Sequence, residues 1–110
     1  MIIAERMLKL RGASEDVPVP VRIFAPRQDN DAWACRWEIH WPDRQRASEM
    51  FGFDSTQSLI LALQTVGSEL YASNEHKSGR LSWFESRTGY GFPVPPNLRH
   101  ILAGDDEAHL

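Results

Sequence analysis

The alternation of apolar and polar residues is strictest in the segment WACRWEIHW, residues 33–41. Every second residue is apolar, while arginine, glutamate and histidine fill most positions between. Side chains of a β-strand point alternately to opposite faces, so this period of two predicts a strand with one buried and one solvated face. The predicted core-facing residues are Trp33, Cys35, Trp37, Ile39 and Trp41.

Further strands are predicted on both sides of this segment. The N-terminal segment IIAERMLKL has a strand pattern that Arg6 interrupts. In VPVPVRIF, residues 17–24, Pro18 and Pro20 lack two backbone donors on one side of the strand. We therefore expect residues 17–24 to form an edge strand or to pair only from Val21 onward.

The segment RGASED is expected to connect the first two strands as a hairpin, and WPDR predicts a type I turn. After this turn the chain is expected to return as a strand around residues 44–53. Sequential strands with short links form a meander more often than other topologies.

The apolar period changes to that of an α-helix over residues 59–70. The helix is predicted over 55–74, with Asp54 or Ser55 as N-cap and Gln57 placed to reach back to the cap. Its outer face is predicted to carry Ser58, Leu61, Thr65 and Ser68.

Aromatic, glycine and proline residues are concentrated in GRLSWFESRTGYGFPVPP. A short strand is predicted at LSWF, on which Trp83 and Phe84 point to opposite faces. Glycines allow the segment 88–96 to turn and prolines stiffen it, which favours a lid over the core rather than the rim of a binding site. Which of the two aromatics is exposed stays open, and the exposed one is expected near Tyr90, where it could anchor a partner.

These elements predict an α+β fold, with an antiparallel four- to five-stranded sheet packed against one main helix and a Pro/Gly-rich C-terminal arm. A chain of 110 residues favours one domain, which we place at 1–103. The acidic segment 104–110 has no core-forming pattern and is expected to be a flexible tail.

Net charge, hydropathy and cysteine content argue against some classes of function. The net charge of −3 gives no positive field for phosphate backbones, and acidic residues lie among the local arginines, so we expect no nucleic-acid partner. No apolar run approaches the length of a membrane span. A charged residue stands already at the fifth position, which is unlike the apolar core of a signal peptide. With a single cysteine, these features predict a cytoplasmic protein and no membrane partner.

No catalytic or metal-binding motif is apparent. Cys35 and His40 have opposite parity on their strand, so their side chains cannot meet as nucleophile and base. The four histidines are scattered without the spacing of a metal site, and the GYG at 89–91 is too short for a phosphate loop. We therefore expect no enzyme activity, cofactor or metal.

The order of short motifs resembles a family of short bacterial proteins, a domain of unknown function. The motifs are an IAER-type strand, a tryptophan-containing strand, a DSTQSLILAL-type helix start, a GRLSW element and a closing GFPVP. They cover most of the chain except its acidic tail. The resemblance implies no catalytic residue.

Two hypotheses follow. The first is a protein-interaction module that self-associates or binds a partner, a class that includes immunity and antitoxin proteins. The alternative is a small-ligand site, or an undetected enzyme, where the 88–96 arm meets the start of the helix. The candidate ligand- or partner-binding residues are Gln57, Trp83, Phe84, Arg87 and Tyr90.

Overall fold

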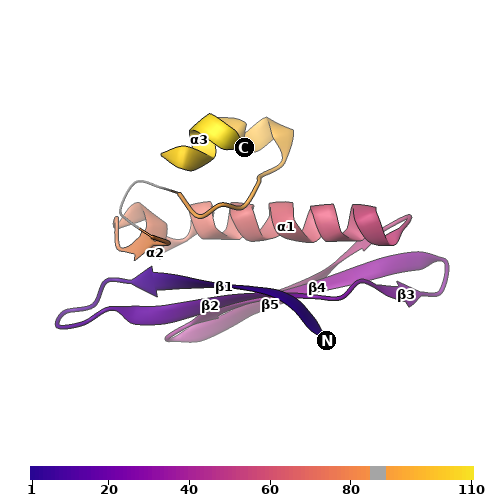
Figure 1. Cartoon of the computed structure of the whole chain (residues 1–110), viewed down its shortest axis with the longest axis horizontal. Helices are drawn as coiled ribbons and strands as arrows, with labels where there is room; N and C mark the ends of the chain where they lie inside the picture. The colour runs from indigo at the N-terminus through magenta and orange to yellow at the C-terminus, as the bar shows by residue number, and fades with distance from the viewer. Residues whose placement is uncertain (85–88) are drawn as a thin grey trace.

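The structure is a computed structural model that describes residues 1–84 and 89–110 (Figure 1). The strands are β1 (Ile2–Leu10), β2 (Val17–Phe24), β3 (Arg27–Asp29), β4 (Ala32–Trp41), β5 (Arg44–Gly52) and β6 (Leu81–Ser82), and the helices are α1 (Ser55–Ala72), α2 (Asn74–Lys77), the 3₁₀ helix η1 (Pro96–Ile101) and α3 (Asp105–His109). Figure 1 shows α1 lying between the sheet and the C-terminal segment. The α+β fold with one main helix on an antiparallel sheet is confirmed.

The sheet places β2 in its interior. β2 pairs with β1 along its whole length, whereas its ladder with β4 covers only residues 21–23. Pro18 and Pro20 explain this asymmetry, because they remove donors from the side that would continue toward β4. The prediction that pairing starts at Val21 is thus correct for β4, and the prediction of an edge strand is wrong.

The hairpins follow the predicted turns. β1 and β2 are joined across residues 11–16, and β4 and β5 are joined across Pro42 and Asp43. β3 was not expected. It pairs with the start of β4 on the same side as β2, because β5 occupies the other side of β4.

The alternation of β4 is confirmed from Cys35 onward, whereas Ala34, at a position of the polar face, is also buried. Cys35, Trp37, Ile39 and Trp41 are buried, and Trp33 is half-buried. On the opposite face, Glu38 accepts a hydrogen bond from Nε of Arg36 at 2.9 Å and contacts Nε2 of His40 at 2.7 Å. The polar side of β4 is therefore a row of polar side chains in which Glu38 bridges Arg36 and His40.

The start of α1 matches its sequence signals. Oδ1 of the N-cap Asp54 accepts from the Gln57 amide at 2.8 Å. The Gln57 side chain reaches back one residue beyond the cap and accepts from the Phe53 amide at 2.6 Å. Ser58, which was predicted on the outer face, is buried, because the Gly52 backbone lies so close that a Cβ there would be 2.6 Å from the Ser58 nitrogen.

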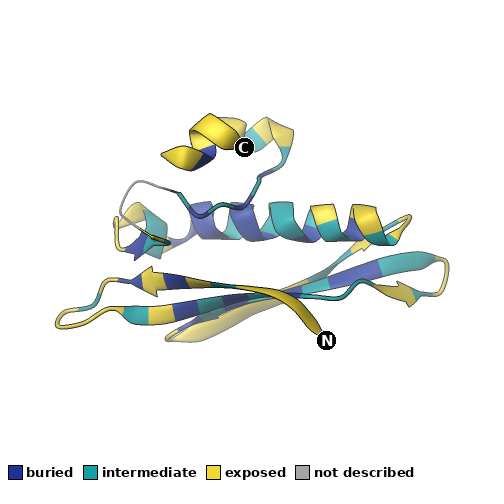
Figure 2. Ribbon diagram, viewed as in Figure 1, coloured by how far each residue is buried: buried dark blue, intermediate teal, exposed yellow. Residues whose placement is uncertain are grey.

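The arm after residue 88 is a lid. Tyr90, Phe92 and Val94 are buried against the core (Figure 2). Gly67 allows the close approach, since a Cβ on it would lie 1.9 Å from the Pro93 carbonyl oxygen. The lid prediction is confirmed.

The C-terminal segment continues over the arm. Residues 104–110, which were expected to be flexible, include helix α3, and its Asp106 is 2% exposed. Leu102 joins the core just before this helix. The sequence does not predict this arrangement, because the hydrogen-bond partners of Asp106 lie far from it along the chain.

Candidate functional site

The residues proposed as a site from the sequence lie in two separate places. Tyr90 contacts the ring of Tyr71 near the end of α1, whereas Gln57 lies in its first turn. These two helix positions are about 21 Å apart at about 1.5 Å of rise per residue. The arm therefore runs along the C-terminal half of α1, and the site expected at the start of the helix is not assembled. Arg87 lies outside the described residues.

Trp83 and Phe84 do not point to opposite faces. β6 ends at Ser82, so strand alternation no longer applies to the next two residues. Their rings stack with centroids 4.4 Å apart, and Phe84 is 68% exposed while Trp83 is half-buried. They line a cavity of about 240 Å³, whose other lining residues are Gly91, Asp105, Asp106, His109 and Leu110.

A buried carboxylate, that of Asp106, borders this cavity. Oδ2 of Asp106 accepts from the Tyr71 hydroxyl at 2.6 Å and from the Tyr90 amide at 2.8 Å, while Oδ1 accepts from the Gly91 amide at 2.8 Å. A buried carboxylate needs such donors to offset lost hydration. No sequence signal singles out Asp106, because adjacent acidic residues share its local pattern.

The two tyrosines of this cluster stay protonated. Burial, together with the hydrogen bond to Asp106, raises the pKa of Tyr71. Burial and the nearby charge of Asp106 raise the pKa of Tyr90. Both hydroxyls therefore keep their protons at neutral pH: that of Tyr71 donates to Asp106, and that of Tyr90 lies 2.5 Å from Nδ1 of His76.

Arg6 is the cation of the cluster. Its Nη1 donates to the carbonyl oxygens of Tyr90 and Gly91, each at 3.0 Å, and its guanidinium lies 3.8 Å from the centroid of the Trp83 ring. Burial lowers the pKa of Arg6, and the charge of Asp106 opposes this effect. The residue that seemed to interrupt the first strand thus ties β1 to the arm.

His76 makes the stability of this region dependent on pH. Burial, and to a lesser degree the charge of Lys77, lower its pKa below the ordinary value of 6.5. As the pH falls, His76 therefore binds a proton in the unfolded chain before it does so in the folded chain. The contribution of neutral His76 to the free energy of unfolding is complete above about pH 6.5 and is lost as the pH falls through the folded pKa.

We expect His76→Gln to lose less stability than the wild type between pH 7 and pH 5, because glutamine does not titrate. Urea unfolding at both pH values measures the difference. Asn97→Gln serves as a control for an exposed change, and it should keep the wild-type pH dependence. An equal pH dependence in His76→Gln would show that His76 does not cause it.

A second surface feature lies at the other end of α1. Phe53 is 91% exposed and Phe51 is 53% exposed. Both border an open cavity of about 330 Å³, whose other lining residues are Ala32, Gly52, Gln57 and Leu61. The two phenylalanines of the segment MFGF are the sequence signal that could have indicated this feature. Their exposure, however, depends on where the helix lies over the sheet.

The chemical pairings considered from the sequence have these positions. Cys35 is buried and its Sγ donates to the Phe24 carbonyl at 3.3 Å, while His40 is on the opposite face of β4. Burial raises the pKa of Cys35. Within the described ranges, no three His, Cys, Asp or Glu residues are grouped to hold a metal ion. No helix in this part of the chain has the length and hydropathy needed to cross a membrane.

Comparison with known proteins identifies the family of this chain. Searches of curated proteins and of solved structures found no match. Residues 4–94 match a protein family described as a domain of unknown function (DUF6968), and these residues include the sheet, α1, α2 and most of the arm. The chain therefore belongs to the DUF6968 family.

Proposed function

We propose that the protein is a protein-interaction module that binds a second copy of itself through the free edge of β5 and the apolar cavity at its end. The observation that carries the proposal is Phe53, a phenylalanine with 91% of its surface exposed beside an open apolar cavity. Large exposed aromatic side chains beside such cavities are typical of interfaces.

The cavity is large enough for the ring of a partner. Its volume is about 330 Å³, and a cavity of about 150 Å³ can hold a benzene molecule. In a dimer with two-fold symmetry, Phe53 of each copy enters the cavity of the other, since the same patch serves both sides. Phe51 and Leu61 supply apolar walls for the incoming ring.

The edge of β5 is suited to pairing. Within the described residues β5 pairs with β4 alone, so its other edge has free backbone groups. Two β5 edges brought together in antiparallel orientation would extend the sheet across both copies.

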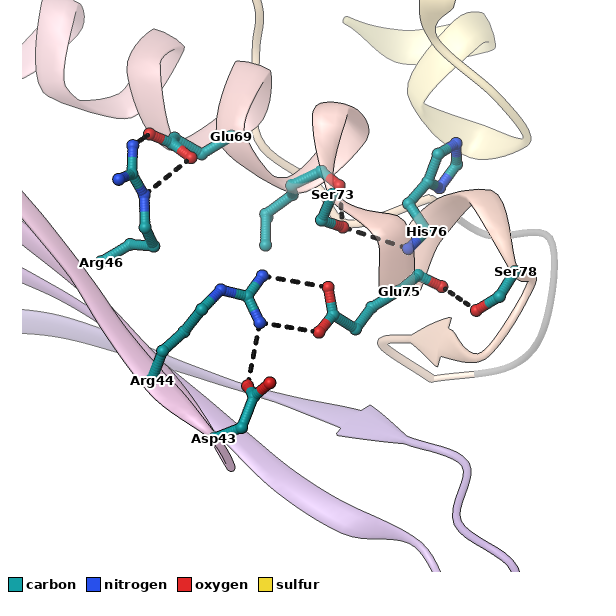
Figure 3. Close-up of polar contacts among 9 residues, drawn as sticks. Asp43, Arg44, Arg46, Glu69, Ser73, Glu75, His76 and Ser78 are labelled. Carbon is teal, nitrogen blue, oxygen red and sulfur yellow. Dashed lines mark hydrogen bonds and ion pairs between the residues drawn. The ribbon is translucent and has the colours of Figure 1, made fainter.

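The charged side chains of β5 are neutralised within the chain. Arg44 donates to both carboxylate oxygens of Glu75, at 2.9 and 3.1 Å, and Arg46 pairs with Glu69 at 2.6 Å (Figure 3). Glu49 accepts from Arg27 at 2.8 and 2.9 Å. A second copy therefore approaches an edge without a strong field of one sign.

Light scattering tests this proposal. The wild type should approach twice the 12.6 kDa chain mass as concentration rises, and Phe53→Ser should remain at the mass of one chain. The expected loss is at least tenfold in dimer affinity, because removing a central aromatic from an interface often costs more than about 2 kcal/mol. Met7→Ser, which removes an exposed apolar side chain from β1, is the control and should still dimerise. A wild type that stays monomeric at every soluble concentration would contradict the proposal.

An immunity or antitoxin role belongs to the same class, since such proteins act by binding another protein. A monomer that forms a stoichiometric complex with a foreign protein through Phe53 would favour that role over self-association. We propose binding rather than catalysis because the polar groups of the buried cluster are engaged with one another.

A further inference from the structure

The GYG loop at residues 89–91 has the geometry of an anion-binding loop. Gly89 and Gly91 have φ angles of 76° and 74°, in the left-handed region that favours glycine. The successive amides of Tyr90 and Gly91 both point at the carboxylate of Asp106. Successive amides in such turns form concave sites that bind anions. The loop is too short to wrap a phosphate chain, but it accommodates a single carboxylate.

Two side chains complete the site. The Tyr71 hydroxyl supplies a third donor to the carboxylate. Arg6 donates to the carbonyl oxygens of the same two loop residues, and its positive charge interacts favourably with the charge of Asp106. Three donors and one cation are the partners that a buried carboxylate requires.

The carboxylate fits tightly against the backbone of the loop. A Cβ on Gly89 would lie 2.3 Å from Cγ of Asp106. The three donors to the carboxylate and Arg6 lie within residues 4–94, the part of the chain that matches the family, whereas Asp106 lies beyond it. The receiving site and its present occupant therefore belong to different segments of the chain.

We propose that the GYG loop, Tyr71 and Arg6 form a carboxylate-binding site that Asp106 occupies in the free protein and from which an external carboxylate displaces it. The cavity that this carboxylate borders has apolar walls from Trp83, Phe84 and Leu110, with His109 and Asp105 as its other ionisable lining residues. The ligand is accordingly a carboxylate that carries an apolar neighbour, either as a free small molecule or as an acidic residue of a peptide. This site is separate from the β5 edge and does not depend on self-association.

The first test uses the full-length variant Asp106→Ala, which keeps the donors and leaves space for a formate ion. Formate should raise its melting temperature by about 5 °C more than the same concentration of chloride, because a ligand that binds only the folded state stabilises it. Asp106→Asn, whose amide fills the space, is the matched control and should show no such difference. A folded Asp106→Ala without a formate response would overturn the proposal.

A peptide distinguishes the two sources of carboxylate. The peptide with the sequence of residues 104–110 is compared with the same peptide carrying asparagine at the position of Asp106. Stabilisation of Asp106→Ala at tenfold lower concentration by the acidic peptide than by formate assigns the site to a peptide ligand. Stabilisation by formate alone assigns it to a small molecule.

A measurement on the wild type keeps the test independent of the stability of the variant. Formate, but not chloride, should shift the amide resonances of Tyr90 and Gly91, because it competes with Asp106 for those two donors. Unchanged resonances at formate concentrations that leave the protein folded would show that Asp106 is a permanent structural contact.

Discussion

Replacing Gly67 with alanine is expected to lower the free energy of unfolding by about 2–3 kcal/mol and to loosen the C-terminal arm. The new Cβ would lie 1.9 Å from the Pro93 carbonyl oxygen. That oxygen belongs to the backbone of a proline-stiffened segment, so it cannot rotate away as a side chain can. Alanine favours a helix over glycine by about 1 kcal/mol, and the expected loss is therefore the net of a larger clash.

Urea unfolding measures this change. Ser68→Ala is the control, because Ser68 is the next residue of the same helix and its hydroxyl bonds within the helix, to the Gln64 carbonyl at 3.0 Å. It should change stability by no more than about 0.5 kcal/mol. A Gly67→Ala variant more stable than the wild type would mean that the arm does not lie against α1 at this position.

Replacing Arg6 with methionine is the second substitution with a large expected effect, a loss of about 2–3 kcal/mol. Methionine keeps an apolar stem of similar reach but donates no hydrogen bond. The carbonyls of Tyr90 and Gly91 lose their donor, and Trp83 and Phe92 lose the cation that lies 3.8 and 4.9 Å from their ring centroids. Asp106 also loses a nearby positive charge.

Arg22→Met is the matched control. Arg22 also lies on the sheet, and its 2.7 Å ion pair with Glu5 is solvent-exposed. Such pairs contribute about 0–1 kcal/mol, so this variant should lose less than Arg6→Met. The tryptophan emission should shift only in Arg6→Met, because Trp83 stacks on Arg6. Equal losses in the two variants would show that Arg6 does not anchor the arm.

The function and the site could be predicted from the sequence less completely than the fold. The aromatic content of residues 79–96 indicated Trp83, Phe84 and Tyr90. In the structure the rings of Trp83 and Phe84 stack on each other, whereas the ring of Tyr90 packs against Tyr71 and His76. Gln57 was grouped with them because the sequence does not give the direction in which the arm crosses α1. Phe53 was missed, since an exposed and a buried phenylalanine have the same local pattern.

Local patterns by themselves determined the main strands and the main helix of this protein, although not β3 or α3. The period of two fixed which side of β4 is buried, and the period of 3.6 with Asp54 as cap placed α1, because both depend on residues within a few positions of one another. Pro18 and Pro20 limited the ladder of β2 for the same reason. These features follow from backbone geometry that a short segment carries with it.

The tertiary structure alone decided how the segments meet. Arg6, Gly67 and Asp106 have roles that depend on partners at least fifteen residues away along the chain. An arginine within a strand pattern and an aspartate within an acidic tail are both expected in solvent, and each becomes an anchor only when the arm brings its amides and carbonyls within reach. Long-range contacts of this kind produce no periodic pattern in a single sequence. The buried cluster could therefore be identified only in the folded chain.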